Sequence, residues 1–273
     1  MAVKVASEQL GPADDDSDSG DVPKETTDEL MQDVLADFRA NPQALAVDDD
    51  LTAHYWPCFP LRKILGLAEV GLHDAVLDGD VEGVRAAVHR LSKRAPRRLN
   101  EYDPQGRTAL SLAVKTGRED VADQLIGMPH VELGVPDVAT GLTALHHAVL
   151  LNMPRTVDRL IKAEAPIDTA DKLGMTALML ACRKGRKLMV ELLVEDADAQ
   201  LELADAAGWT AVFYATYHDE GELVEYLVQH GCDLGHRDKK GMSPLDWADS
   251  MNHDDLVVFL NECARAGLGG RAL

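Results

Sequence analysis

Between residues 67 and 264, apolar residues recur as pairs of short helical stripes with a fixed period. The first stripe of each pair carries a leucine or valine followed three residues later by an alanine, and residues three apart share a helix face. These pairs are Leu72/Ala75, Leu110/Ala113, Leu145/Ala148, Leu178/Ala181, Val212/Ala215 and Leu245/Ala248. A second apolar stripe follows after a polar break, as in Val121 and Leu125. The pattern predicts about six units of two helices, the first of them (near 71–78 and 80–91) partly degenerate.

A glycine-led pentapeptide opens the first helix of five units. It reads GRTAL from Gly106, GLTAL from Gly141, GMTAL from Gly174, GWTAV from Gly208 and GMSPL from Gly241, with steps of 35, 33, 34 and 33 residues. A fixed period of this length is typical of solenoids built from stacked helical pairs. Its third residue, Thr or Ser, stands where a helix N-cap belongs. We therefore expect an all-α repeat solenoid over residues 67–264, working through an extended recognition surface.

The residues before the array differ from it in composition. Residues 1–50 hold 14 acids and 3 bases, and we expect an acidic, largely disordered arm because it has too little apolar surface to offset the entropy of ordering. Within it, residues 26–40 have the spacing of one amphipathic helix. Residues 51–66 contain an aromatic cluster around Trp56, which we interpret as a cap over the first repeat, or alternatively as a short anchor for a partner. Residues 265–273 are expected to form a flexible tail.

Bulk composition excludes several classes of function. The formal net charge of −20 argues against nucleic-acid binding, which needs a basic surface. No apolar run approaches the roughly 20 residues of a membrane-spanning helix. The four cysteines lack zinc-site spacing, and we expect reduced thiols in the cytosol, with nucleus or cilium left open.

Motifs for catalysis and metal binding are weak. Asp14, Asp16, Asp18 and Glu25 fall at positions 1, 3, 5 and 12 of a possible calcium loop, but Gly20 falls at position 7, where the turn requires glycine at 6. The adjacent histidines 146 and 147 point to different helix faces and cannot form a metal site alone. No nucleophile elbow, phosphate-binding loop or zinc-protease motif occurs. We therefore expect no enzyme, no cofactor, no metal and no small-molecule substrate.

The repeated motif resembles that of ankyrin repeats over about 200 of the 273 residues. An aspartate precedes the motif glycine by three residues in four units, and Asp137 precedes it by four in a finger one residue longer. Residues 143–148, TALHHA, are the nearest full match. The family's helix-opening proline appears only as Pro244, and Glu164 replaces the glycine that ends the second helix.

The resemblance implies a β-hairpin finger and two antiparallel helices in each unit, with fingers and first helices lining a concave groove where partners bind. It also implies that His146 and His73 are buried, hydrogen-bonded structural residues. The finger positions are Arg107, Leu142, Met175, Trp209 and Met242, and the groove positions include Lys115, Leu150, Leu151, Arg183, Lys184, Tyr217 and His218. Since four of the five finger residues are large and apolar, we expect an exposed apolar ridge with basic flanks, suited to a peptide or helix with hydrophobic anchors and nearby acids.

The leading functional hypothesis is a non-enzymatic adaptor that binds another protein, with no nucleic acid or membrane as partner. One alternative is a regulatory subunit or inhibitor of an enzyme that uses the acidic N-terminal arm. Another is a structural component of a large cytoskeletal or ciliary assembly. Deleting residues 1–50 would abolish control in the second case and spare groove binding in the first, and gel filtration in lysate would reveal the third.

Overall fold

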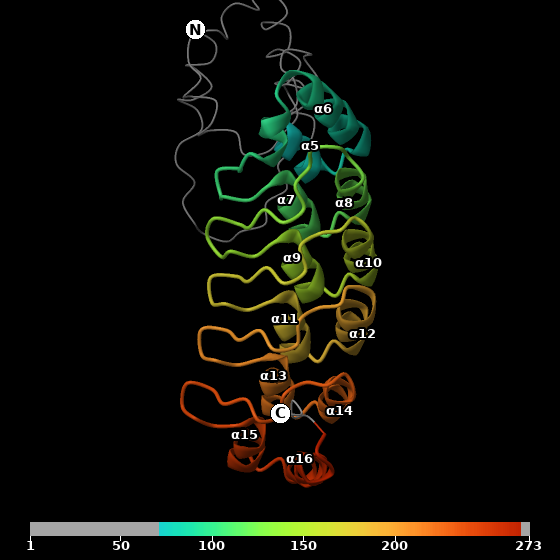
Figure 1. Cartoon of the computed structure of the whole chain (residues 1–273). Coiled ribbons are helices and arrows are strands. Elements are labelled where there is room, and N and C mark those ends of the chain that lie inside the picture. The colour runs from blue at the N-terminus through green and yellow to red at the C-terminus, as the bar shows by residue number, and fades with distance from the viewer. Residues whose placement is uncertain (1–70, 269–273) are drawn as a thin grey trace, which may run out of the picture. The chain divides into compact units, whose positions relative to one another are not determined.

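The computed structural model of the protein describes residues 71–268. The predictions for the acidic arm, the helix at 26–40, the calcium loop and the segment around Trp56 all lie outside the described residues. The described part consists of helix pairs stacked one upon the next, as Figure 1 shows.

Each pair has an inner helix and an outer helix that returns beside it, and from α7 onward the inner helix follows the motif glycine. The inner helices are α5 (Leu72–Asp78), α7 (Ala109–Lys115), α9 (Ala144–Leu150), α11 (Ala177–Arg183), α13 (Ala211–Tyr217) and α15 (Pro244–Ser250). The outer helices are α6 (Val81–Arg94), α8 (Glu119–Ile126), α10 (Pro154–Lys162), α12 (Lys187–Glu191), α14 (Gly221–Gln229) and α16 (Asp254–Ala266), with η2 (Pro96–Asn100) after α6 and η3 (Leu192–Asp196) after α12. The all-α repeat solenoid of six units is confirmed, and its last helix ends two residues beyond the predicted 264.

The predicted N-caps begin the five inner helices from α7 to α15. Thr108, Thr143, Thr176, Thr210 and Ser243 occupy the cap positions. The Thr108 hydroxyl accepts from the backbone N–H of Ser111 at 3.2 Å, and Ser243 forms a reciprocal capping box with Asp246. Seven-residue helices are too short to be stable alone, so stacking must supply most of their stability.

The core runs through the stack at the predicted leucine and alanine positions. The repeated alanine is 0% exposed in every unit, from Ala75 to Ala248. The leucine or valine three residues before it is buried in the first five units, and only Leu245 in the last is partly exposed. A methyl group at the alanine position lets neighbouring inner helices approach closely, which explains why this residue does not vary.

Each inner helix from α7 onward is preceded by a closed turn, here called its finger. In the finger before α11, the Asp171 backbone N–H donates to the Met175 carbonyl at 2.9 Å. Neighbouring fingers share one backbone bond each, such as Val138 N–H to Gly106 O at 2.8 Å. The fingers keep this hairpin-type bond without a ladder, since no β-strand occurs in residues 71–268.

The motif glycine is required by both conformation and space. Gly174 has φ +82°, and a Cβ atom there would lie 2.9 Å from the backbone nitrogen of Ala206 in the next finger. A side chain at this position would therefore strain the turn and push the two fingers apart.

Candidate protein-interaction surface

The fingers are held rigid by their aspartates. In four of them, the Oδ1 oxygen accepts from the backbone N–H groups two and four residues later, as Asp171 does from Leu173 at 2.8 Å and from Met175 at 2.9 Å. The same pair of bonds occurs at Asp103, Asp205 and Asp238. An aspartate that binds the backbone ahead of it fixes a turn locally. The fingers can therefore present their side chains in a defined geometry.

The second oxygen, Oδ2, has different partners in the fingers of Asp103, Asp205 and Asp238. Asp103 Oδ2 accepts from Arg107 Nε at 2.9 Å and Nη2 at 2.6 Å. Burial alone would raise the pKa of Asp103, but the Arg107 side-chain and backbone donors together hold it below its usual value. Arg107, predicted to contact a partner, is half-buried and bound within its own finger.

The last two fingers share an aromatic cluster with the inner helices. Asp238 Oδ2 accepts from the indole N–H of Trp209 at 3.1 Å and of Trp247 at 2.9 Å. Burial opposes ionisation of Asp238, but the Met242 backbone N–H and the two indoles lower its pKa below the ordinary value. The Trp209 ring lies 5.1 Å from that of Trp247 and 5.3 Å from that of Tyr217. Lys240 Nζ covers the Trp247 ring at 4.9 Å from its centroid.

The cluster is therefore partly structural. Trp209 and Tyr217 are half-buried, and the Trp209 indole joins its own finger to the next through Asp238. Tyr214 adds a further link, since its hydroxyl donates to Asp205 Oδ2 at 2.6 Å. Burial and this carboxylate raise the pKa of Tyr214. The remaining exposed ring edges of Trp209 and Tyr217 are what a partner could contact.

The longer finger uses its aspartate differently. Asp137 accepts from Ser111 Oγ at 2.5 Å with Oδ1 and contacts His147 Nε2 at 2.8 Å with Oδ2, and all three residues are buried. Asp137 thereby joins α7 to α9. Although serine, histidine and aspartate meet here, the carboxylate lies between the other two and the Ser111 side chain is fully buried. The arrangement is a buried structural network and offers no accessible nucleophile.

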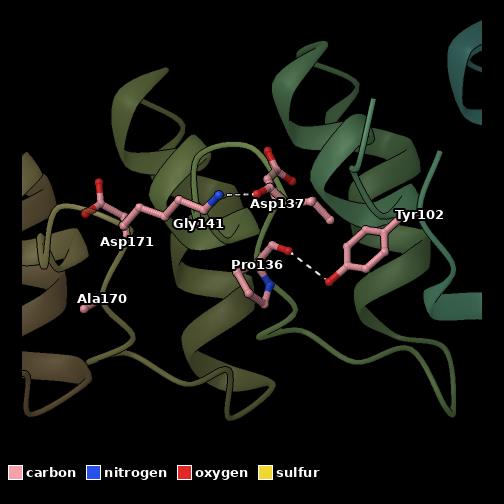
Figure 2. Close-up of a pocket in the computed structure, with 8 residues that line it drawn as sticks. Tyr102, Pro136, Asp137, Gly141, Ala170 and Asp171 are labelled. Carbon is pink, nitrogen blue, oxygen red and sulfur yellow. Dashed lines mark hydrogen bonds between the residues drawn. The ribbon is translucent and has the colours of Figure 1, made fainter. Parts of the chain in front are cut away.

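A shallow cavity of about 320 Å³ lies across three successive fingers, as Figure 2 shows. Its walls include Tyr102, whose hydroxyl donates to the Pro136 carbonyl at 3.2 Å. Lys172 lines the cavity too and donates from Nζ to the Val138 carbonyl at 2.5 Å. Three large apolar side chains at these fingertips face solvent: Tyr102 is 46% exposed, Val138 54% and Leu173 62%. These three residues are called the fingertip patch below.

A second exposed row lies at the other end of the inner helices. It consists of the residues that cap them at their C-termini, and it is called the cap row: Thr116, Leu151, Lys184, His218 and Met251. All five are exposed. Lys115, next to the row at the end of α7, is exposed as well.

The prediction of an exposed apolar ridge at the positions after the motif glycine is wrong, because these side chains are buried or half-buried. Met175 is 2% exposed, and Leu142, Trp209 and Met242 are half-buried. The reason is that the finger folds back toward its helix at this point, so Leu142 and Trp209 pack against the core. The same holds for Leu150, which is half-buried against the core.

The other residues predicted to contact a partner differ in their exposure. Lys115, Leu151, Lys184 and His218 are exposed, as a contact role requires. Arg183 is half-buried, with Nη1 3.4 Å from the sulfur of Met175. The fingertip patch was missed by sequence reasoning, because its residues stand four, three and one residues before the motif glycine and the repeat period does not mark them as one set.

The two histidines assigned structural roles differ. His146 is fully buried, with Nδ1 2.8 Å from the Thr143 hydroxyl and Nε2 3.1 Å from the Met175 carbonyl of the next finger. Burial lowers the pKa of His146. His73 is only half-buried, and its Nε2 atom has no hydrogen-bond partner in the described part of the chain. The expectation therefore holds for His146 and fails for His73.

Two other features bear on the class of function. In residues 71–268, no group of histidine, cysteine, aspartate or glutamate side chains is arranged to hold a metal ion. Over the same range, no helix is both long and apolar enough to span a bilayer. The described geometry is that of a repeat scaffold with ordered fingers and with exposed apolar and basic side chains.

Comparisons with known proteins give the family. The family model for ankyrin repeats matches residues 123–205 and 197–267, and the chain belongs to the ankyrin-repeat family. Ankyrin repeats are generally protein–protein interaction modules and are typically non-enzymatic.

The similar proteins are much longer than this chain. Inversin of Canis lupus familiaris is 31% identical over 185 residues, covering 67% of this chain and 16% of inversin. Ankyrin repeat protein nuc-2 of Neurospora crassa is 33% identical over 149 residues, covering 54% of this chain and 14% of nuc-2. The chain thus spans less than a fifth of the length of these curated relatives.

Solved structures agree with the fold. The ankyrin repeat domain of Bcl-3, a member of the IkappaB protein family, matches with a TM-score of 0.62 and 27% identity, covering 70% of this chain and 84% of that domain. The ankyrin repeat protein EF0377 matches with a TM-score of 0.63 and 22% identity, covering 71% of this chain and 98% of that protein, and it supports the fold alone.

Proposed function

We propose that this chain is a non-enzymatic adaptor that binds a protein partner through its fingers and the C-terminal ends of its inner helices. The supporting observation is the distribution of exposed apolar side chains. Of nine large hydrophobic residues exposed in residues 71–268, six lie in the fingers or at inner-helix ends. The six are Leu77, Tyr102, Val138, Leu151, Leu173 and Met251. Exposed apolar side chains in such number, at the fingers and at the opposite ends of the same inner helices, are typical of interfaces.

The side chains beside these six residues indicate which chemical groups a partner should carry. Lys184 belongs to the cap row together with Leu151, and Lys115 lies next to the row at the end of α7; both lysines are exposed. A peptide or helix with apolar anchors and a few carboxylates would satisfy both the apolar and the basic groups. Trp209, Tyr217 and Met242 would contribute their exposed edges, while Leu142, Leu150 and Met175 support the surface from beneath. No small molecule, nucleic acid or membrane is proposed as partner.

The test uses exposed leucines of matched accessibility. Leu151 is 49% exposed in the cap row and Leu173 62% exposed in the fingertip patch, while Leu188 is 52% exposed on the outer helix α12. A partner recovered by affinity purification and mass spectrometry should be lost with Leu151→Ser and Leu173→Ser, and retained with Leu188→Ser. Melting curves should be unchanged for all three, because exposed substitutions shift stability by only about 0.5 kcal/mol. Loss of the partner with Leu188→Ser alone would refute the assignment.

We also propose the cytosol as the compartment. The three cysteines in the described residues, Cys182, Cys232 and Cys263, are free thiols, which suits a reducing environment. Fractionation of cells expressing the tagged full chain tests the proposal, and recovery with secreted proteins would contradict it.

A further inference from the structure

The outer part of the first repeat carries a charge unlike that of the rest of the array. Residues 83–100, which include most of α6 and all of η2, contain six arginines and lysines and no acid, in a chain whose formal net charge is −20. In the other five repeats, the outer helix and the loop after it have at least as many acids as bases. The basic character is therefore particular to the first repeat and is not a general way of keeping outer helices soluble.

Three cations on the other outer helices join neighbouring repeats. Asp123 of α8 pairs with Arg155 at 3.2 Å and with Arg159 at 3.7 Å, both on α10. Lys187 of α12 pairs with Glu222 of α14 at 2.8 Å. These residues already have a structural purpose within the stack.

Three cations of the first repeat have no such purpose. Lys93, Arg94 and Arg97 are exposed, and within residues 71–268 none of them has a hydrogen-bond or ion-pair partner. The nearby acids Glu82 and Glu101 already pair with other arginines. Lys93 and Arg94 lie in the last turn of α6, where the helix dipole favours cations. That effect does not account for Arg97, because α6 ends before it. These three residues are called the basic corner.

The backbone that carries the basic corner is fixed. Leu99 of η2 is 1% exposed, so it anchors the 3₁₀ turn in the core. The Asn100 side chain bridges to the next repeat, donating to the His130 carbonyl at 3.0 Å and accepting from the Glu132 N–H at 2.9 Å. Because this backbone is already ordered, a ligand of the corner would have to immobilise side chains only.

We propose that the basic corner binds a short segment of a protein partner that is rich in aspartate or glutamate. This second surface lies on the outer side of the first repeat and goes beyond the function proposed for the fingers and inner-helix ends. Charge complementarity selects an anionic ligand. The excess of basic residues on the outer side is confined to the first repeat, so a long polyanion such as a nucleic acid would extend into an otherwise acidic array.

The experiment measures fluorescence anisotropy of a labelled deca-glutamate peptide titrated with the full chain. The test variant is Lys93→Glu/Arg97→Glu. The matched control is Lys162→Glu/Arg265→Glu, which makes the same change in net charge at two exposed cations on the outer helices α10 and α16, away from the surface proposed for the fingers and inner-helix ends. We expect the peptide to bind about tenfold more weakly to the test variant and with little change to the control. Binding should also weaken when salt is raised from about 50 to about 150 mM, because the pairs are exposed.

Four outcomes would overturn the proposal. Equal losses in both variants would show a response to net charge alone, and absence of binding to the unmodified chain would remove the site. If the peptide binds only after Asp14, Asp15, Asp16 and Asp18 are replaced by asparagine, the ligand of the corner is the chain's own acidic stretch. Tighter binding of a labelled oligothymidine than of the peptide would assign it to nucleic acid. Circular dichroism melting of each variant ensures that the comparison is made between folded proteins.

Discussion

The buried network around Asp137 should be the most sensitive polar position in the array. Its carboxylate accepts from Ser111 at 2.5 Å and contacts His147 at 2.8 Å, and all three side chains are buried. Asp137→Ala removes both contacts and leaves the Ser111 hydroxyl and the His147 ring nitrogen without partners. A hydrogen bond to a charged group contributes about 1.5–3 kcal/mol, and an unsatisfied buried partner adds to the loss. We therefore expect the variant to lose about 3–5 kcal/mol of unfolding free energy.

The measurement is urea unfolding followed by circular dichroism at neutral pH. Ser111→Ala should cost less, about 1.5–3 kcal/mol, because it removes only the hydrogen bond to Asp137 Oδ1 and Asp137 keeps its contact with His147. Asp249→Ala is the matched control: Asp249 is exposed on α15, so the change should stay within about 0.5 kcal/mol. A loss below about 1 kcal/mol for Asp137→Ala would show that the longer finger is not anchored by its carboxylate.

Three further predictions follow from local geometry and ionisation. Glu164 has φ +58° where the equivalent Gly231 has +82°, so Glu164→Gly should raise the urea midpoint by an amount equivalent to about 0.5–1 kcal/mol. Burial lowers the pKa of His146 below 6.5. As the pH falls, the unfolded chain therefore binds a proton at this histidine before the folded chain does, and the free energy of unfolding should decrease below about pH 6.5. His146→Gln should remove this contribution to the pH dependence. Burial also raises the pKa of the Cys182 thiol, so iodoacetamide should label Cys182 in urea and not in the native chain, as mass spectrometry can show.

The fold could be predicted because its determinants are local and periodic. The alanine of each inner helix recurs, as does the hydroxyl residue that caps the five inner helices from α7 to α15, and the structure places every one of these alanines at 0% exposure. The structure also shows how the chain accommodates one departure from the motif. Glu164 stands where the family has glycine, and its backbone adopts the left-handed conformation that glycine favours.

The partners that join finger carboxylates to a neighbouring repeat could not be predicted, because they are distant in sequence. Ser111 reaches Asp137 across 26 residues, and Trp209 reaches Asp238 across 29. The period does indicate that adjacent repeats touch at equivalent positions. It does not indicate which side chain of one repeat is long enough to reach the free carboxylate oxygen of the next, because that depends on the rotamers of both residues.

The candidate surface was misplaced within each finger for a related reason. The motif glycine has a positive φ, and the chain reverses direction at this residue, so the side chains on its two sides face opposite ways. Leu173 before Gly174 is 62% exposed, whereas Met175 after it is 2% exposed. The Met175 carbonyl is also held by His146 Nε2 at 3.1 Å, which draws this residue into the stack. A search for interface residues in such repeats should therefore begin with the side chain before the glycine, because the backbone turn itself directs that side chain into solvent.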